Sequence, residues 1–315
     1  MAWPAGVSDS RPPMTRPPSR LVVATLVGLG AILLWSTGGP LLTLVPDFPP
    51  FQLVAMTFVF FFVVMVPVWR ARGQSIVAKF RMPPKVWLVG IAGPWGYTVC
   101  FFTSYQMITP VHASLLLLSW PVLLLLANAL LRDRRIRWWH GLGAAAGFGG
   151  AILLVVARQT GDGPDTAPLF GYLIAAAGAV SFFLYSYCRS GWPEVATDAG
   201  ALFCLGGAVL SVPFHLAFET TVMPDATAWA VIVMFGLGNV MAALFAWDYG
   251  MKFGQVRSLV ALSYLTPLVT ALLLIAIGAS PFTTTAAVAC LLIVGGAFLG
   301  SRDLFMKLPA SVQPT

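Results

Sequence analysis

Apolar segments of about 20 residues recur along the whole chain, separated by short polar or Pro/Gly-rich stretches. An α-helix of about 20 residues spans the roughly 30 Å hydrocarbon core of a bilayer. Only 9% of the residues are charged, against about 25% in soluble domains, so charges could not cover a water-exposed surface of this size. The segments predict an all-α, polytopic membrane protein and exclude a cytosolic enzyme, a nucleic-acid-binding protein and a disordered chain.

Ten of these segments are predicted to be membrane spans. They are Leu21–Leu44, Phe51–Trp69, Lys85–Ile108, Ala113–Leu131, Trp138–Ala157, Leu169–Cys188, Asp198–Phe218, Ala228–Met251, Ser258–Ile277 and Thr283–Gly300. Residues 1–20 are rich in proline and arginine and cannot bury a core, so they are predicted to be a disordered tail.

Basic residues are segregated by the loops between the predicted spans. Of the 18 lysines and arginines, all except Arg158 fall on one side when the ten spans alternate in direction. Excess Lys and Arg mark the cytoplasmic side of a membrane, so both termini are predicted to be cytoplasmic. The net charge of +7 then reflects topology and not a nucleic-acid partner.

The two halves of the chain share features at a fixed spacing. The Gly-Gly-Ala sequence at 149–151 returns at 295–297, and Pro121 returns as Pro267. Spans one to five therefore resemble spans six to ten, which predicts repeats at 21–158 and 169–301 and a tail at 302–315. Because five is odd, the second repeat enters the membrane from the opposite face, an architecture found in secondary transporters. A channel is the alternative for such a repeat.

Proline and glycine interrupt several of the predicted spans. Pro40, Pro94, Pro121 and Pro267 each lie within a span. Interrupted helices are the best pointer to a transporter site, because a proline frees a backbone carbonyl that must then face protein or a water-filled cavity. A kink that only shapes helix packing is the alternative at each proline.

Aromatic and polar side chains deep within the spans are candidates for the wall of a cavity. Trp35 lies well inside span one, Trp120 directly precedes Pro121, and Tyr264 lies three residues before Pro267. Ordinary packing and an interhelical hydrogen bond of Asn239 are the alternatives. The predicted substrate-binding residues are Trp35, Tyr97, Trp120, Pro121, Tyr185, Asn239, Tyr264, Thr266 and Pro267.

Apart from Asp198, the first residue of span seven, Asp248 is the only carboxylate within a predicted span. Such an acid suggests a role in proton coupling. However, Asp248 lies near the end of its span with Lys252 four residues later, an arrangement that favours a helix-stabilising ion pair. We therefore expect a structural pair with Lys252, and a coupling role is the alternative.

Sequence motifs for catalysis and for nucleotide binding are absent from the chain. It contains no GxxxxGK[ST], no HExxH and no GxSxG sequence, and its four cysteines lie in four different spans. We expect no enzyme activity, no cofactor and no metal site. The glycines of Gly143-x-x-x-Gly147 with Gly150, and Gly295, Gly296 and Gly300, are expected to let spans five and ten approach neighbouring helices closely.

These features together resemble the drug/metabolite transporter superfamily, EamA type, over about residues 21–300. The residues that carry the resemblance are Ser263-Tyr264-Leu265-Thr266-Pro267-Leu268 in span nine and the Gly-Gly-Ala ends of spans five and ten. The resemblance implies a basket of ten helices around a central cavity, with spans five and ten outside. The chain is most similar to the bacterial aromatic amino acid exporters, which implies export across the inner (plasma) membrane. In this family an acid often follows span four or span nine; here Asp133 follows span four, but Gly278-Ala279 follows span nine.

The predicted cavity has aromatic rings and hydroxyls but no lysine or arginine in mid-span. A phosphate-bearing substrate would require basic partners. An aromatic amino acid fits better, since its side chain can stack on Trp or Tyr. The alternatives are other neutral amino acids or drugs, and, in another class, a membrane sensor or scaffold that transports nothing. The lipid bilayer and the small molecule are the only expected partners, and a monomer is expected to suffice.

Overall fold

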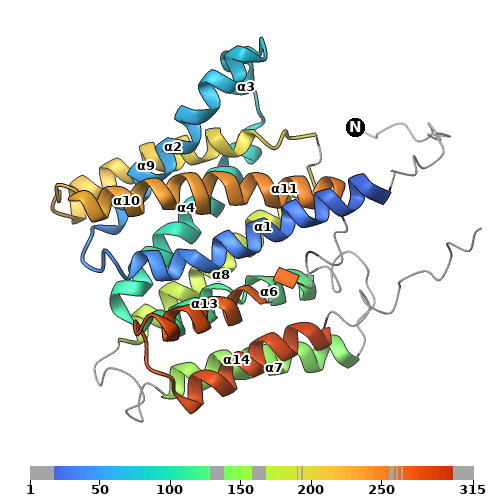
Figure 1. Cartoon of the computed structure of the whole chain (residues 1–315), viewed down its shortest axis with the longest axis vertical. Coiled ribbons are helices and arrows are strands. Elements are labelled where there is room, and N and C mark those ends of the chain that lie inside the picture. Colours follow the sequence, from blue (N-terminus) through green and yellow to red (C-terminus); the bar gives the residue numbers. More distant parts are fainter. Residues whose placement is uncertain are drawn as a thin grey trace, which may run out of the picture.

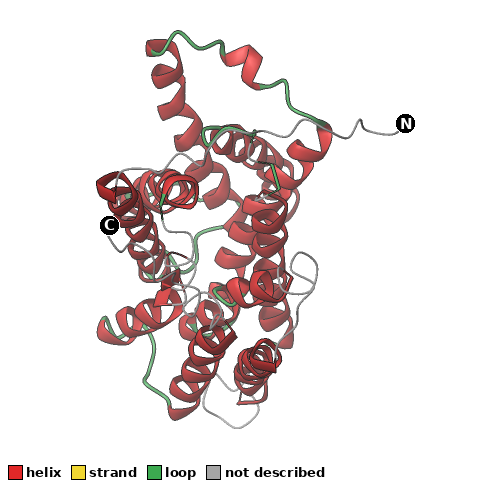
Figure 2. Ribbon diagram, turned by 90° about the vertical axis from the view of Figure 1, so that its right-hand side faces the viewer, coloured by secondary structure: helices red, strands yellow, loops and turns green. Residues whose placement is uncertain are grey.

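The computed structural model describes residues 18–127, 138–157, 168–189, 191–192, 194–254, 259, 262–263 and 265–300. All regular secondary structure in these ranges is helical, as Figures 1 and 2 show. The predictions for the N-terminal tail, for Tyr264, for Arg158 and for residues 302–315 fall outside the described residues.

Six helices in the described ranges are long and apolar enough to cross a membrane, and three shorter apolar helices accompany them. This finding confirms the prediction of an all-helical, multi-pass membrane protein. The helices are α1 (Pro18–Leu42), α2 (Pro50–Ala71), α3 (Ile76–Lys79), α4 (Pro84–Met107), α5 (Pro110–Leu117), α6 (Trp120–Ala127), α7 (Trp138–Ala157), α8 (Leu169–Arg189), α9 (Ala199–Phe218), α10 (Ala226–Met234), the π-helix η2 (Phe235–Ala242), α11 (Ala243–Phe253), α13 (Leu265–Ala276) and α14 (Thr284–Gly300).

Local sequence explains where several helices begin. Pro50, Pro84 and Pro110 occupy the first position of α2, α4 and α5, where the missing N–H costs no intrahelical bond. The Asp225 carboxylate caps α10 by accepting a hydrogen bond from the Ala228 N–H at 2.7 Å.

The interruptions predicted in spans one and three are wrong. Helix α1 continues through Pro40 to its last residues, and α4 continues through Pro94. The interruption predicted in span four, at Pro121, is confirmed, because α5 ends at Leu117 and α6 begins at Trp120. Span eight changes its hydrogen-bond pattern at η2.

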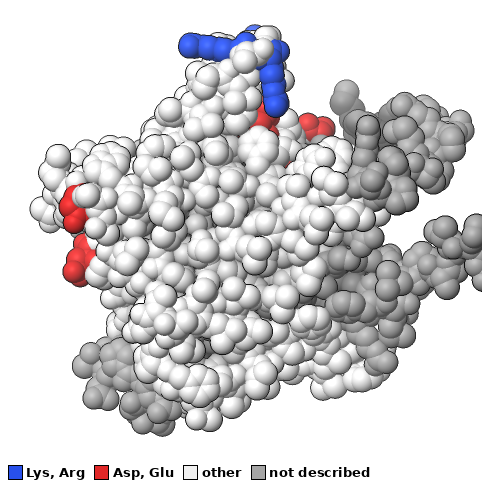
Figure 3. Space-filling model, in the orientation of Figure 1, with Lys and Arg blue, Asp and Glu red and all other residues white. Residues whose placement is uncertain are grey.

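Apolar side chains cover the outside of the helix bundle. Leu88, Val209 and Leu291 are 70%, 64% and 72% exposed, whereas the hydroxyl-bearing side chains of Thr57 and Ser104 are fully buried. In the face shown in Figure 3, charged atoms lie at the edges and the middle is uncharged. This distribution is the one expected for a bundle whose sides face lipid tails.

The main helix pairs join the first and second halves of the chain. Helix α1 packs along α11, α4 along α8, α2 along α9, and α7 along α14. In Figure 1 the α7–α14 pair lies at the bottom of the molecule, below the remaining helices. Each half contributes one helix to every pair, so neither half could bury its apolar faces alone.

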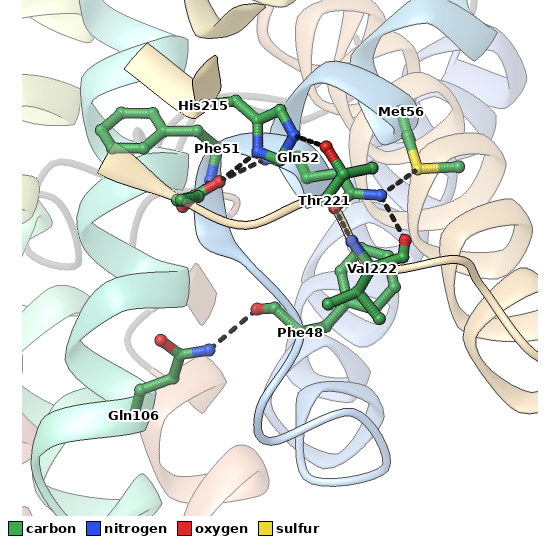
Figure 4. Close-up of polar contacts among 9 residues, drawn as sticks. Phe48, Phe51, Gln52, Met56, Gln106, His215, Thr221 and Val222 are labelled. Atoms are coloured by element: carbon green, nitrogen blue, oxygen red, sulfur yellow. Dashed lines mark hydrogen bonds and ion pairs between the residues drawn. The ribbon is translucent and has the colours of Figure 1, made fainter. Parts of the chain in front are cut away.

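A hydrogen-bonded network joins α2 to the connection between α9 and α10 (Figure 4). The Glu219 carboxylate accepts hydrogen bonds from the N–H groups of Phe51 and Gln52 at 2.8 and 3.1 Å, in the first turn of α2. The Gln52 amide exchanges two hydrogen bonds with the backbone of Val222, and His215 contacts Glu219 and Thr221 at 2.8 Å each. An acidic group at a helix N-terminus is stabilising, so this network fixes that end of the α2–α9 pair.

The close packing predicted from the glycines of spans five and ten is confirmed. A Cβ atom on Gly296 of α14 would lie 2.5 Å from the Gly143 carbonyl oxygen and 2.9 Å from the Gly147 nitrogen of α7. A Cβ atom on Gly150 would lie 2.9 Å from the Ala289 carbonyl oxygen. Backbone atoms cannot move aside as a flexible side chain can, so only glycine permits this approach.

We predict that Gly296→Leu separates α7 from α14 and lowers the free energy of unfolding by about 1–3 kcal/mol, the usual cost of overpacking. Gly295→Leu is the matched control, because a Cβ atom at Gly295 meets nothing within 4 Å. Thermal unfolding of the purified protein in detergent measures both. Equal stability of the two variants would contradict the close contact.

Candidate functional site

A small cavity lies among the helices of the bundle, with a volume of about 70 Å³. Its walls come from α1, α2, α4, the α5–α6 break, α8, η2, α11, residue 263 and α13. None of the described lining residues is charged. They are Trp35, Gly38, Gly39, Phe58, Pro94, Tyr97, Thr98, Phe101, Leu118, Trp120, Pro121, Phe182, Phe235, Asn239, Val240, Leu244, Ser263, Thr266 and Thr270.

The break between α5 and α6 faces this cavity. Leu118, Trp120 and Pro121 all line it, and Trp120 is only 4% exposed. Pro121 is the second residue of α6, where it has no N–H to donate back to the preceding turn. The irregular backbone at this break therefore lies where protein and a cavity surround it.

The π-helix η2 supplies the opposite wall. Asn239 lies in it, is buried, and lines the cavity. Its backbone oxygen accepts a hydrogen bond from the Trp35 indole at 3.1 Å, and its side-chain amide donates to the Thr37 hydroxyl at 3.4 Å. A Cβ atom on Gly38 would lie 2.9 Å from the Asn239 side-chain oxygen, so glycine makes room for the amide. Asn239 therefore bonds to α1 and also faces the cavity.

Aromatic rings form the part of the wall nearest α8. Phe182 lies at the centre of this group, 4.9 Å from Trp120 and 4.9 Å from Tyr97 between ring centroids. Trp35 lies 6.1 Å from Phe182 and 5.4 Å from Trp247. Edge-on and tilted rings at these separations attract one another and leave ring faces for a further ring to stack on.

The predicted site residues divide between the cavity and its surroundings. Tyr185 packs 5.8 Å from Phe182, and Pro267 is buried in α13, but neither is among the described lining residues. Tyr264 lies outside the described residues. The structure places six of the predicted residues on the cavity wall, namely Trp35, Tyr97, Trp120, Pro121, Asn239 and Thr266.

Phe182 and Trp247 belong to the aromatic group but were not predicted from the sequence. Phe182 is one of 22 phenylalanines, and its position in an apolar run carries no signal of its own. Trp247 offered a weak sequence signal, because it is a tryptophan next to Asp248, an acid within a predicted span.

Asp248 does not line the cavity. Its Oδ1 atom lies 3.6 Å from an Arg189 guanidinium nitrogen at the end of α8, and its Oδ2 atom accepts a hydrogen bond from the Thr197 hydroxyl. The Lys252 side chain expected as its partner is not among those described. Asp248 therefore joins the ends of α8 and α11 and the segment that precedes α9. Arg189 and Asp248 are 59 residues apart in the chain, so their contact could not be predicted from helical spacing.

Comparison with known proteins agrees with this arrangement. Residues 22–156 match the EamA-like transporter family. The chain is 40% identical over 276 residues to the aromatic amino acid exporter YddG of Ancylobacter novellus, an alignment that covers 87% of this chain and 95% of the relative. A solved crystal structure superposes with a TM-score of 0.70 at 38% identity, covering 90% of this chain and 99% of its own. The chain therefore belongs to the EamA-like transporter family, whose members are transporters and not enzymes.

Proposed function

We propose that this protein exports aromatic amino acids by alternating access around the central cavity. The observation that carries the proposal is an uncharged cavity walled by Trp35, Tyr97, Trp120 and Phe182. The similarity to an aromatic amino acid exporter over most of both chains supports the same substrate class and the direction of transport.

The chemistry of the wall suits a zwitterion with an aromatic side chain. The substrate ring stacks against Trp120 or Trp35, and its ammonium group lies over a neighbouring ring face, a contact worth about 0.5–2 kcal/mol. The Asn239 amide and the Thr266 hydroxyl supply dipoles for the carboxylate and ammonium groups. A charged wall would favour a substrate with net charge, and the described wall has none.

Transport requires the cavity to widen. Its 70 Å³ is well below the roughly 300–1,000 Å³ of most small-molecule sites, so the cavity is too small for an aromatic amino acid in this conformation. Among the described residues, the helical hydrogen-bond pattern changes beside the cavity at the α5–α6 break and at η2. We propose that they are the points at which the surrounding helices bend when the cavity opens.

Ten spans arranged as two inverted five-helix repeats account for the helix pairs. A two-fold axis in the membrane plane would exchange the α1–α11 pair with the α4–α8 pair. It would map the α2–α9, α7–α14 and α5–α13 contacts onto themselves. All five contacts occur, which supports repeats at 21–158 and 169–301, with tails at 1–20 and 302–315.

The location follows from the family and the charge distribution. We propose a monomer in the bacterial plasma membrane with both termini in the cytoplasm, since excess Lys and Arg mark that side. No cofactor is needed for the transport step.

Counterflow in proteoliposomes tests the proposal against two other functions. Exporters of other neutral amino acids or drugs would show saturable flux with another substrate preference, and a membrane sensor or scaffold would show none. Counterflow of tryptophan, phenylalanine, alanine and threonine in proteoliposomes distinguishes the three.

We predict that Trp120→Ala weakens counterflow of tryptophan and phenylalanine by a few-fold to about tenfold, the loss expected from one stacking contact. Alanine and threonine should be affected less, because they have no ring to stack. Trp229→Ala is the control, since Trp229 is 47% exposed and does not line the cavity. An equal loss for aromatic and small substrates would indicate a defect in folding or gating instead of lost stacking.

We predict that single cysteines at Arg134 and Asp162 are labelled from opposite sides of the membrane, with Arg134 cytoplasmic. The charge segregation of the loops leads to this expectation. Membrane-impermeant maleimide applied to intact cells and to inverted vesicles measures it, with the native cysteines removed. Labelling of both positions from one side would contradict the inverted repeat.

We predict that Asp248→Asn leaves the pH dependence of transport unchanged and lowers the free energy of unfolding by about 0.5–1 kcal/mol, because the acid holds Arg189 at the helix ends. Arg189→Gln should cost a similar amount, and the double variant should cost less than the sum. Loss of the response to a proton gradient in Asp248→Asn would favour a coupling role.

A further inference from the structure

A second cavity of about 720 Å³ lies at the end of the helices where α1 meets the α1–α2 connection. We call it the outer vestibule. It is bordered by residues 43–46 and 48 of that connection and by residues 277–279, directly after α13. With the N-terminus in the cytoplasm, this end of α1 faces the outside of the cell.

The outer vestibule has a volume that the central cavity lacks in this conformation, and similar wall chemistry. Its volume falls within the roughly 300–1,000 Å³ typical of small-molecule sites. Phe48, Phe102 and Tyr105 offer ring surfaces, and Gln106 and Thr43 offer polar groups. No described lining residue is charged, so the vestibule suits the same kind of neutral zwitterion as the central cavity.

A thin septum separates the two cavities. On α4, Phe101 lines the central cavity and the next residue, Phe102, lines the vestibule. On α1, Gly39 lines the central cavity and the next residue, Pro40, lines the vestibule. No described residue lines both cavities, so a substrate passing between them must displace a side chain.

Tyr105 is the side chain that closes the septum. It lines the vestibule, and its ring lies 4.7 Å from the Phe101 ring. Its hydroxyl lies so close to Gly39 that a Cβ atom there would collide with it, and the same Cβ atom would lie 3.0 Å from a methyl carbon of Thr270. Tyr105 of α4 therefore fills the space between α1 and α13.

A hydrogen bond holds Tyr105 in this position. The Ser114 hydroxyl donates its single proton to the Pro110 carbonyl at 2.7 Å, so in the Tyr105–Ser114 hydrogen bond the tyrosine donates and the serine accepts. Ser114 is fully buried in the last turn of α5, before the α5–α6 break. A movement of α5 would therefore release Tyr105.

We propose that the outer vestibule is an exit site for the aromatic amino acid and that Tyr105, held by Ser114 against Gly39, is the gate between this site and the central cavity. The substrate class rests on the proposed function, whereas the gate does not. Release of the hydrogen bond lets the Tyr105 ring turn away from Gly39 and joins the two cavities.

Cysteine accessibility tests the gate without any substrate. In a background with Cys100→Ala, Cys188→Ala, Cys204→Ala and Cys290→Ala, Thr98→Cys reports on the central cavity and Thr43→Cys on the vestibule. A membrane-impermeant thiol reagent is added outside intact cells. We expect rapid labelling at Thr43→Cys and slow labelling at Thr98→Cys.

Adding Tyr105→Phe should accelerate labelling at Thr98→Cys by up to roughly tenfold, the effect of losing one hydrogen bond that favours the closed state. Labelling at Thr43→Cys should not change.

A steric pair of variants supplies a second, independent test. Gly39→Ala places a methyl group against the Tyr105 hydroxyl and should displace the ring, so Thr98→Cys labels faster. Adding Tyr105→Phe to Gly39→Ala removes the colliding oxygen and should restore part of the protection that Gly39→Ala removed. Equal labelling of Thr98→Cys with and without these changes would overturn the gate, as would failure of Thr43→Cys to label from outside.

Substrate protection tests the exit site. External tryptophan should slow labelling of Thr43→Cys in the Trp120→Ala background, where stacking in the central cavity is weakened, and alanine should protect less. Equal labelling with and without tryptophan would overturn the exit site. If the gate variants behave as expected but no aromatic amino acid is transported or gives protection, then the gate stands and the proposed substrate class fails.

Discussion

The absence of water in the bilayer core governs this structure, because every backbone N–H and C=O group there must find its partner within the protein. Helices satisfy this requirement locally, and all described regular structure is helical. In the part of the chain that the structure describes, the α5–α6 break and η2 depart from a regular α-helix, and both border the central cavity. An irregular backbone is tolerated there because buried protein surrounds it, and the same irregularity makes those places suited to movement.

Close approach between helices is the second organising feature, and glycine allows it in two different ways. At the α7–α14 contact, Gly296 lets two backbones meet directly. On α1, Gly38 and Gly39 instead leave room for side chains of other helices, the Asn239 amide and the Tyr105 hydroxyl. The first use holds a peripheral helix pair together, and the second shapes the cavity and its septum.

Charge is confined to the ends of the helices. Arg189 with Asp248 and Lys79 with Asp198 lie at one end, and His215 with Glu219 lies at the other. These pairs fasten the segments that connect the helices, where water is near and a charge is inexpensive to maintain. The described walls of both cavities are neutral, so polarity along the path comes from hydroxyl and amide dipoles, which suit a substrate with no net charge.

The sequence by itself determined the fold class and the approximate bounds of the long apolar helices, because these depend on local hydropathy. It also identified Trp35, Trp120, Asn239 and Thr266, whose polar or aromatic groups stand out in an apolar segment. Only the tertiary structure decided that Phe182 completes the aromatic wall, that Tyr185 and Pro267 do not line it, and that Arg189 is a partner of Asp248. These assignments depend on which helices pair and on how each is rotated about its axis. In a segment that is apolar on every side, hydropathy says nothing about rotation, so it is set by contacts between residues far apart in the chain.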